Sequence, residues 1–312
     1  MGILALCLLL PSIAMQRRHF HAAAGLGLLG QLWPSAHAAT ATAAAPAAPD
    51  TTFQHHCQTL EQQAQGRLGV HIIDSASGRS WGYRADERFM LLSSFKLLAS
   101  ALVLHRAETG QEQLTRRIAY PRSALVPWSP ITELHADGPG LTLAQLCHAT
   151  ITTSDNTAGN LILDSFGGPA GLTAYVRQLG DTITRLDRTE PTLNEPTPEG
   201  LMDTTTPRAM AQTMQRLLLG DALAPNARQQ LRDWLLANTT GGKRLKAGVP
   251  TTWQVGDKTG TSTTDANDVG LLMPPQRAPF IVTAYLAESK AVGPVKDACL
   301  AQVAQWVAKH LV

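Results

Sequence analysis

Residues 93–107 read SSFKLLASALVLHRA, and the spacing of their apolar side chains predicts a helix with one heavily buried side. Strand signals precede this helix. The apolar run 68–73 is followed by a turn-forming segment and by a short return strand at 80–84, as in a β-hairpin. A further helix is predicted before the hairpin, at about 53–65. The helix at 93–107 therefore marks the change from a strand-forming start to a helical middle.

Helical signals continue to about residue 238, and strand signals then return. We expect helices at 143–150, 157–166, 168–179, 207–219 and 225–238, strands at 252–255, 269–273 and 279–286, and a last helix at 295–311. Strands at both chain ends with helices between them predict an α/β (α+β) fold. Its antiparallel sheet combines residues 53–90 and 239–312, which also supply the flanking terminal helices. Residues 91–238 form an inserted all-helical domain, and an active site is expected at the seam.

The composition is typical of a globular protein. The chain has 312 residues, of which 44% are apolar and 16% are charged. The formal net charge of +2 includes Arg17 and Arg18, and 26 basic residues minus these two leaves 24, which equals the 24 acidic residues. No basic stripe remains to indicate a nucleic-acid partner.

The N-terminus resembles an export signal. We interpret residues 1–38 as a signal peptide of the twin-arginine type, with translation starting at Met15 and cleavage after Ala36-His37-Ala38. A single membrane anchor is excluded because Arg17 and Arg18 interrupt the apolar runs. Residues 39–52 are an Ala/Thr/Pro tract that we interpret as a flexible leader. The mature protein is therefore expected to be periplasmic or secreted, without stable membrane association.

Three cysteines follow the signal. Cys57 and Cys299 lie on apolar stripes at helical spacing near the two ends of the mature chain. A disulfide between them is one interpretation in an oxidising compartment. Two buried thiols acting as small apolar side chains are the other, favoured interpretation. Cys147 is predicted to lie in the core.

Ser93 and Lys96 form a candidate nucleophile and base. The backbone N–H of Ser93 has no partner within the helix, and Lys96 lies on the same helix face, so its amine can reach the Ser93 hydroxyl. Burial by apolar neighbours and repulsion from Lys258 would favour the neutral amine, which accepts protons. A helix-capping serine beside a solvated lysine explains the pair equally well when it is taken alone.

Ser154-Asp155-Asn156 stands between two predicted helices, where polar residues also occur as an ordinary turn. In the functional interpretation, the Ser154 hydroxyl relays a proton to a leaving nitrogen, and the Asn156 amide binds a substrate carbonyl. Asp155 then braces the turn.

Lys258-Thr259-Gly260-Thr261 ends a predicted strand. Gly260 would let a substrate lie close to the backbone. Lys258 and Thr259 can bind a carboxylate, and the N–H groups of Thr261 and Ser93 can form an oxyanion hole. An exposed strand end explains the same residues when they are considered alone.

In this order and at these separations, the three stretches and Glu190-Pro191-Thr192-Leu193-Asn194 resemble the motif set of the class A serine β-lactamases. The resemblance extends from about residue 53 to the C-terminus. It includes the longer strings LDRTEPTLNE at 186–195 and DTTTP at 203–207.

The resemblance implies hydrolysis of β-lactams, and hence antibiotic resistance, through an acyl-enzyme on Ser93. Glu190 and Asn194 would hold the water that hydrolyses this acyl-enzyme. Whether Lys96 or Glu190 is the base for acylation stays open. Lys258 and Ser154 complete the expected catalytic group.

The same resemblance implies supporting roles for further residues. Arg188 and Asp203 match an ion pair that fixes the loop carrying Glu190. Trp128 matches an aromatic wall beside the site, with a loop Trp packed on the core as the alternative. Arg244 matches an arginine that binds the substrate carboxylate, with an exposed loop cation as the alternative.

Other activities find less support in the sequence. No G-x-S-x-G elbow indicates a Ser-His-Asp triad, and His55-His56-Cys57 has no second pair at ligand spacing, so we expect neither a metal nor a cofactor. A D-alanyl-D-alanine carboxypeptidase or a penicillin-binding sensor would share the Ser, Lys and Lys-Thr-Gly motifs but lack residues placed like Glu190 and Asn194. We therefore expect β-lactam substrates, no nucleic-acid partner and a monomer.

Overall fold

The computed structural model describes residues 50–312, in which five strands form one antiparallel sheet in the order β2-β1-β9-β8-β7. The two early strands are β1 (Arg67–Asp74) and β2 (Ser80–Tyr83). The three late strands are β7 (Gln254–Thr261), β8 (Ala266–Met273) and β9 (Phe280–Ala287). β1 pairs with β9 along its whole length, so the prediction of one sheet built from both ends of the chain is confirmed.

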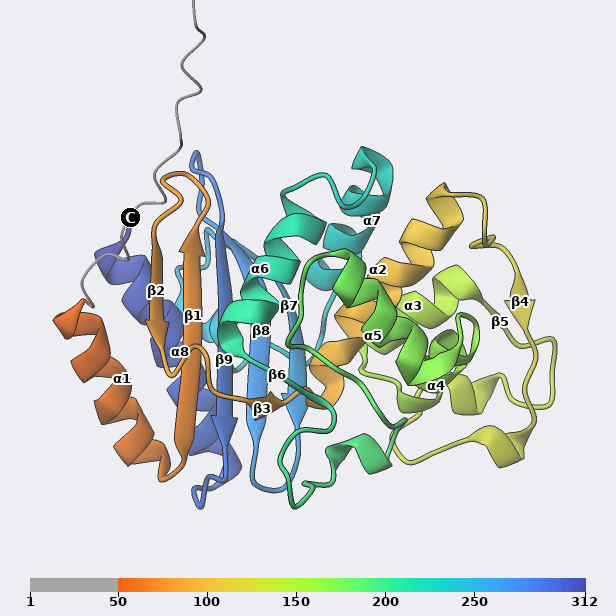
Figure 1. Ribbon diagram of the computed structural model, residues 1–312, viewed down its shortest axis with the longest axis horizontal. Coiled ribbons are helices and arrows are strands. Elements are labelled where there is room, and N and C mark those ends of the chain that lie inside the picture. Colours follow the sequence, from red (N-terminus) through yellow and green to blue (C-terminus); the bar gives the residue numbers. More distant parts are fainter. Residues whose placement is uncertain (1–49) are drawn as a thin grey trace, which may run out of the picture. The chain divides into compact units, whose positions relative to one another are not determined.

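Helices cover both faces of this sheet (Figure 1). One face packs against the terminal helices α1 (Thr51–Ala64) and α8 (Gly293–His310). The helices of the central part of the chain are α2 (Phe95–Glu108), α3 (Leu143–Thr152), α4 (Asn156–Asp164), α5 (Gly168–Gln178), α6 (Pro207–Leu218) and α7 (Pro225–Leu236). Among these, α6 packs on β1 and β9, and α7 packs on β7.

The residues of β9 show how the sequence specifies these layers. All eight side chains of this strand are buried, as expected for a strand covered on both faces. Successive side chains point to opposite faces of a strand. Accordingly, Ile281 and Tyr285 enter the core shared with the central helices, whereas Val282 and Leu286 enter the core beneath α1 and α8.

Some predicted boundaries were wrong. The leader was predicted to reach residue 52, but α1 already begins at Thr51 because the side chain of Asp50 accepts hydrogen bonds from the N–H groups of Thr52 and Phe53. The inserted region is not all-helical either. It contains the two-residue pair β4 (Arg117–Ile118) with β5 (Leu141–Thr142), and β6 (Thr204–Thr205), which pairs with β3 (Phe89–Met90). Strands of two residues are too short to show an alternation of apolar and polar side chains in the sequence.

The predicted signal peptide, the start at Met15 and most of the leader lie outside the described residues. Within residues 50–312, no helix combines the length and apolar character that crossing a membrane requires. The cysteines Cys57, Cys147 and Cys299 are buried and carry no disulfide in this structure.

Candidate active site

A cavity of about 420 Å³ opens where the edge strand β7 meets the central helices, a volume that suits a small molecule. It contains most of the side chains singled out in the sequence. The lining residues are Ser93, Trp128, Ser154, Asn156, Glu190, Asn194, Thr240, Thr259 and Thr261.

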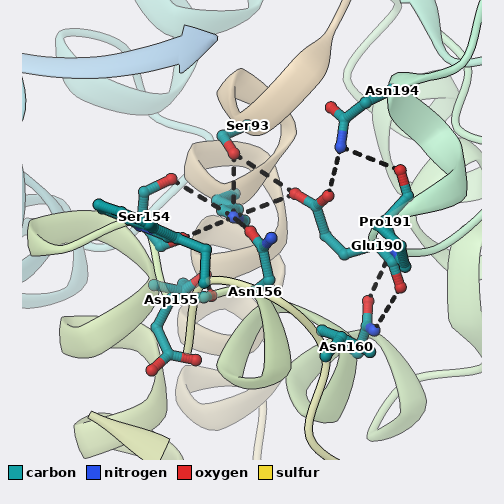
Figure 2. A network of polar contacts seen from close by, with 12 residues as sticks. Ser93, Ser154, Asp155, Asn156, Asn160, Glu190, Pro191 and Asn194 are labelled. Atoms are coloured by element: carbon teal, nitrogen blue, oxygen red, sulfur yellow. Dashed lines mark hydrogen bonds and ion pairs between the residues drawn. The ribbon is translucent and has the colours of Figure 1, made fainter. Parts of the chain in front are cut away.

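Ser93, Asn156 and Glu190 point toward one another in the polar network of Figure 2. Lys96 Nζ contacts all three side chains. This nitrogen is 2.9 Å from Ser93 Oγ, 3.1 Å from Glu190 Oε1 and 2.9 Å from the carbonyl oxygen of Ser154. The residue is fully buried, so Nζ depends on these acceptors. Burial lowers the pKa of Lys96, while the negative charge of Glu190 opposes that shift. The amine is thus placed to exchange a proton with the Ser93 hydroxyl.

The local fold explains this placement. Ser93 lies in the 3₁₀ turn η1 (Leu92–Ser94), which leads directly into α2. Lys96 is the second residue of α2, so one turn of helix carries both groups on the same side. Leu92 precedes the serine with a φ of 46°, a left-handed conformation that costs on the order of 1 kcal/mol and persists only when the surroundings enforce it.

The carboxylate of Glu190 is fixed from two sides. Its Oε2 accepts a hydrogen bond from Asn194 Nδ2 at 2.6 Å, and Ser93 Oγ lies 3.4 Å from its Oε1. Asn160 on α4 binds the backbone of the same residue: its Oδ1 accepts from the Glu190 N–H, and its Nδ2 donates to the Glu190 carbonyl, both at 2.9 Å. The side chains of Glu190 and Asn194 are thus in direct contact beside the Ser93 oxygen.

Lys258 approaches the cavity from β7. Its Nζ donates to Ser154 Oγ at 3.1 Å and to the carbonyl of Thr259 at 2.8 Å. Burial lowers the pKa of Lys258 well below its usual range, and the positive charge of Lys96 adds to that shift. Ser154 Oγ is also 3.4 Å from Lys96 Nζ, so this hydroxyl connects the two amines.

The turn between α3 and α4 holds Ser154 in a left-handed conformation, with a φ of 59°. Asp155 is buried and binds the N–H groups of Ile131 and Thr132 through Oδ2, so it braces the turn as predicted from the sequence. Asn156 Nδ2 donates to the carbonyl of Pro127 at 2.8 Å. Because an amide nitrogen has two hydrogens, one remains for a substrate carbonyl.

The end of β7 presents backbone groups to the cavity. Ser262 N–H donates to the Asp265 carbonyl across the β7–β8 turn. Since paired and unpaired positions alternate along an antiparallel ladder, the N–H of Thr261 is directed away from β8. Gly260 also meets a packing requirement within the protein. A Cβ there would lie 2.8 Å from the Cβ of Leu92, so Gly260 is required for the packing of η1 on β7.

Arg244 does not line the cavity and is not an exposed loop cation, because only 7% of it is accessible. Its Nε pairs with Asp297 on α8 at 2.8 Å, and one terminal nitrogen binds the carbonyls of Gly260 and Asn267. The other terminal nitrogen donates to Thr261 Oγ1 at 2.8 Å. The guanidinium thus acts on the cavity through Thr261.

Trp128 is exposed at the rim, so it is not packed on the core, and its Nε1 donates to the Thr153 carbonyl. The expected ion pair is present: Arg188 Nε lies 2.7 Å from Asp203 Oδ2. Arg188 also donates to the carbonyl of Glu195, so the segment carrying Glu190 is tied at both ends.

Three residues of the site were not predicted from the sequence. Asn160 holds Glu190, Asp297 holds Arg244, and Thr240 Oγ1 lies 2.6 Å from Thr259 Oγ1. Only Asn160 left a signal, because it follows Asn156 by four residues and so shares its helix face. Within residues 50–312, His, Cys, Asp and Glu side chains form no group suited to holding a metal ion.

Comparison with known proteins supports a single family. Residues 52–311 match the model of the beta-lactamase enzyme family. The chain is 46% identical over 253 residues to the β-lactamase FAR-1 of Nocardia farcinica, covering 81% of this chain and 80% of that protein. It is 48% identical over 228 residues to the carbapenem-hydrolyzing β-lactamase KPC of Klebsiella oxytoca, covering 72% and 78%.

Solved structures support the same family. The crystal structure of the putative class A β-lactamase PenP from Rhodopseudomonas palustris superposes with a TM-score of 0.81 at 54% identity, covering 83% of this chain and 99% of that one. An ancestral class A β-lactamase gives a TM-score of 0.80 at 53% identity, covering 82% and 98%.

Proposed function

Because the chain belongs to the class A β-lactamase family, and is thus a hydrolase that opens the β-lactam ring and confers resistance, we propose that it works through a covalent Ser93 acyl-enzyme. The observation that carries this proposal is the convergence of Ser93, Lys96 and Glu190 within 3.4 Å of one another. A nucleophile, a proton acceptor and a carboxylate in one cavity are the groups that acyl transfer to water requires.

In the acylation step, Ser93 Oγ attacks the β-lactam carbonyl carbon while its proton passes to a base. Two groups reach the hydroxyl: Lys96 directly, at 2.9 Å, and Glu190, at 3.4 Å. The oxyanion is stabilised by the N–H groups of Ser93 and Thr261. The C–N bond then breaks, and the leaving nitrogen takes a proton from Ser154, which Lys258 and Lys96 can resupply.

In the deacylation step, Glu190 accepts a proton from a water that it holds together with Asn194. The resulting hydroxide attacks the ester carbonyl, the ester C–O bond to Ser93 breaks, and Ser93 Oγ takes back the proton held by Glu190. The second step distinguishes a hydrolase from a protein that stays acylated, because without it the ester on Ser93 persists.

The substrate carboxylate is expected to bind at the end of β7. Thr259 and Thr261 line the cavity there, Arg244 supplies positive charge behind Thr261, and Lys258 adds its charge when it is protonated. Both cations are buried, so water screens their fields less than it would at the surface.

Steady-state hydrolysis of a penicillin, a cephalosporin and a carbapenem by the purified mature chain tests the proposal, with Ser93→Ala as the matched control. Opening of at least one of the three rings, abolished in Ser93→Ala, is the expected result. Removing the nucleophile from a concerted site costs on the order of a million-fold in rate. Equal turnover by both proteins would exclude Ser93 as the nucleophile.

We further propose that the protein is exported to the periplasm by the twin-arginine route and acts there as a monomer without stable membrane association. Arg17, Arg18 and the Ala36-His37-Ala38 site support this. N-terminal sequencing of the exported protein should begin at Ala39, and size-exclusion chromatography should give the mass of one chain. Retention in the cytoplasm after Arg17→Lys/Arg18→Lys replacement would support the route, and unchanged export would contradict it.

A further inference from the structure

A second cavity, of about 370 Å³, adjoins the active site, and among the described residues Asn194 is the one that lines both. The segment 194–204 and the β7–β8 turn at 262–265 form two of its walls, and β3 forms a third. Its volume suits a small molecule. Asn194 apart, the side chains that carry the proposed reaction do not line it.

The charged side chains that line this cavity are of both signs: Arg67, Arg88, Asp265 and Glu288. Arg67 is paired, since its guanidinium lies 3.2 Å from Glu87 Oε2 and 3.7 Å from Glu288 Oε1. Asp265 is 4% exposed, and its Oδ1 accepts a hydrogen bond from the Glu288 N–H at 2.9 Å. These three side chains are therefore already engaged within the protein.

The guanidinium of Arg88 is engaged through only one of its nitrogens, as far as the described residues show. That nitrogen, Nη1, donates to the Ile183 carbonyl at 3.2 Å and to Thr204 Oγ1 at 2.9 Å. Within the same part of the chain, Nε and Nη2 contact no acceptor, and neither of them is sealed from solvent. Arg88 thus keeps two free donor nitrogens and a charge that no described carboxylate pairs.

The two free nitrogens form the edge of a guanidinium that binds both oxygens of a carboxylate. Arg208 shows this geometry elsewhere in the protein, because its Nε and Nη2 bind the two oxygens of Asp86 at 2.7 Å and 2.9 Å. Arg88 therefore offers a carboxylate site that no described residue fills.

The walls of the cavity also include apolar side chains. Phe89 is buried, whereas 41% of Met202 is exposed, so that a ligand covering it would gain by burying apolar surface. Thr197 in the same wall has a buried hydroxyl without a hydrogen-bond partner among the described residues, and such groups are usually satisfied. A complementary ligand therefore joins a carboxylate to a compact apolar body.

We propose that this cavity is a second binding site, for a small organic carboxylate with an apolar body held by Nε and Nη2 of Arg88, and that its occupation slows deacylation through Asn194. The effect on deacylation rests on the proposed function, whereas the binding site does not.

Asn194 connects the two cavities physically. Its Nδ2 donates to Glu190 Oε2 at 2.6 Å and to the Pro191 carbonyl at 3.1 Å, and Figure 2 shows its amide directed at the Glu190 carboxylate. A ligand that fills the second cavity packs against the same side chain. Because a shift of about 1 Å in a positioning group can lower a rate roughly a hundredfold, displacing Asn194 is expected to slow the step that Glu190 serves.

NMR titration of the ¹⁵N-labelled wild type with benzoate tests the binding site without reference to activity. Benzoate should shift the Nε–H signal of Arg88, which Arg88→Lys identifies by its absence, and the amide signals of 262–265. Benzamide has the same size without the charge, and benzylamine is a cation that would favour Asp265, so neither should shift these signals. Equal shifts with benzamide, shifts with benzylamine alone, or benzoate shifts confined to the active-site cavity would overturn the proposal.

Variants in two walls of the cavity locate the site. Arg88→Lys keeps a positive charge but lacks the two-nitrogen edge, so the affinity for benzoate should fall at least tenfold. Met202→Glu adds a negative charge and should weaken benzoate binding, whereas Met202→Gln, of the same size, should stay within about twofold of the wild type. Because Met202 is exposed, this pair keeps the test available if Arg88→Lys does not fold. Unchanged affinity in a folded Arg88→Lys, or equal affinities in the two Met202 variants, would exclude this cavity.

The lifetime of the acyl-enzyme tests the effect on deacylation. The adduct is formed first with a penicillin, so that the active-site cavity is filled, and benzoate is then added while mass spectrometry follows the loss of the adduct. Saturating benzoate should lengthen the lifetime severalfold in the wild type and leave it unchanged in Met202→Glu. An unchanged lifetime in the wild type would overturn the coupling through Asn194. A wild type that forms no adduct would contradict the proposed function, and the titration would still decide the binding site.

Discussion

Glu190 Oε1 lies 3.4 Å from Ser93 Oγ, although 97 residues separate the two in the chain. Lys96 Nζ touches both groups, at 3.1 Å and 2.9 Å. The carboxylate is thus close enough for one water to contact both it and an ester formed on the serine. In the proposed mechanism, this proximity is what lets the protein release its acyl group instead of only capturing a β-lactam.

Replacing Asp203 by alanine should slow deacylation and destabilise the fold. Its buried carboxylate accepts from Arg188 Nε and from the backbone N–H groups of Asp187 and Arg188. Losing it leaves Arg188 without its partner, for a loss of about 3 kcal/mol in the free energy of unfolding. Urea titration measures that loss, and mass spectrometry after mixing with a penicillin should show a longer-lived adduct. Asp203→Asn is the control, because its side-chain oxygen can still accept hydrogen bonds. Its free energy of unfolding and its adduct lifetime should lie between those of the wild type and Asp203→Ala.

The stability of the protein should depend on the protonation of Lys258. Burial lowers the pKa of this amine in the folded state, so between that pKa and the unfolded value near 10.4 the unfolded chain binds more protons. In that window the free energy of unfolding rises with pH, by up to about 1.4 kcal/mol per pH unit for one proton. Lys258→Met lacks this contribution. Urea titrations across the window should therefore show the free energy of unfolding rising more steeply with pH in the wild type than in the variant. Parallel pH dependences in the two proteins would contradict a lowered pKa for Lys258.

Arg244→Ala should impair substrate binding more than chemistry. The variant loses the hydrogen bond to Thr261 Oγ1 and leaves Asp297 without its cation. We expect KM for a β-lactam bearing a free carboxylate to rise at least tenfold, with a smaller change in kcat, because binding of ground and transition states weakens together. Thr261→Val is the companion variant, since it removes the same hydrogen bond and leaves the guanidinium in place. A change confined to kcat in both variants would refute this assignment.

The sequence predicted the architecture for an identifiable reason, and the structure brings the main candidate site residues together in one cavity. Ser93 with Lys96, and the strand ending in Lys258 to Thr261, are local patterns whose residue spacing already fixes which side chains share a face. The apolar run at 279–286 likewise indicated a strand, which is β9 in the structure.

The remaining features depend on partners distant in the sequence. Arg244 is buried because Asp297 on α8 and two strand carbonyls receive it, which no local pattern shows. Gly260 leaves room for Leu92, which lies more than 160 residues earlier in the chain. Asn160 is an ordinary polar helix residue until the loop carrying Glu190 packs against it. Tertiary packing, rather than propensity, determines these features.

The most direct test of the account is intact-protein mass spectrometry of Glu190→Ala mixed with a penicillin. The variant keeps Ser93 and Lys96, so it should form an acyl-enzyme whose mass exceeds that of the free protein by one penicillin, located on Ser93 by peptide mapping. The adduct should persist, whereas the wild type treated in the same way should return to its free mass. A variant that shows no adduct, or that turns over the penicillin at the wild-type rate, would contradict the assignment of Glu190 to deacylation.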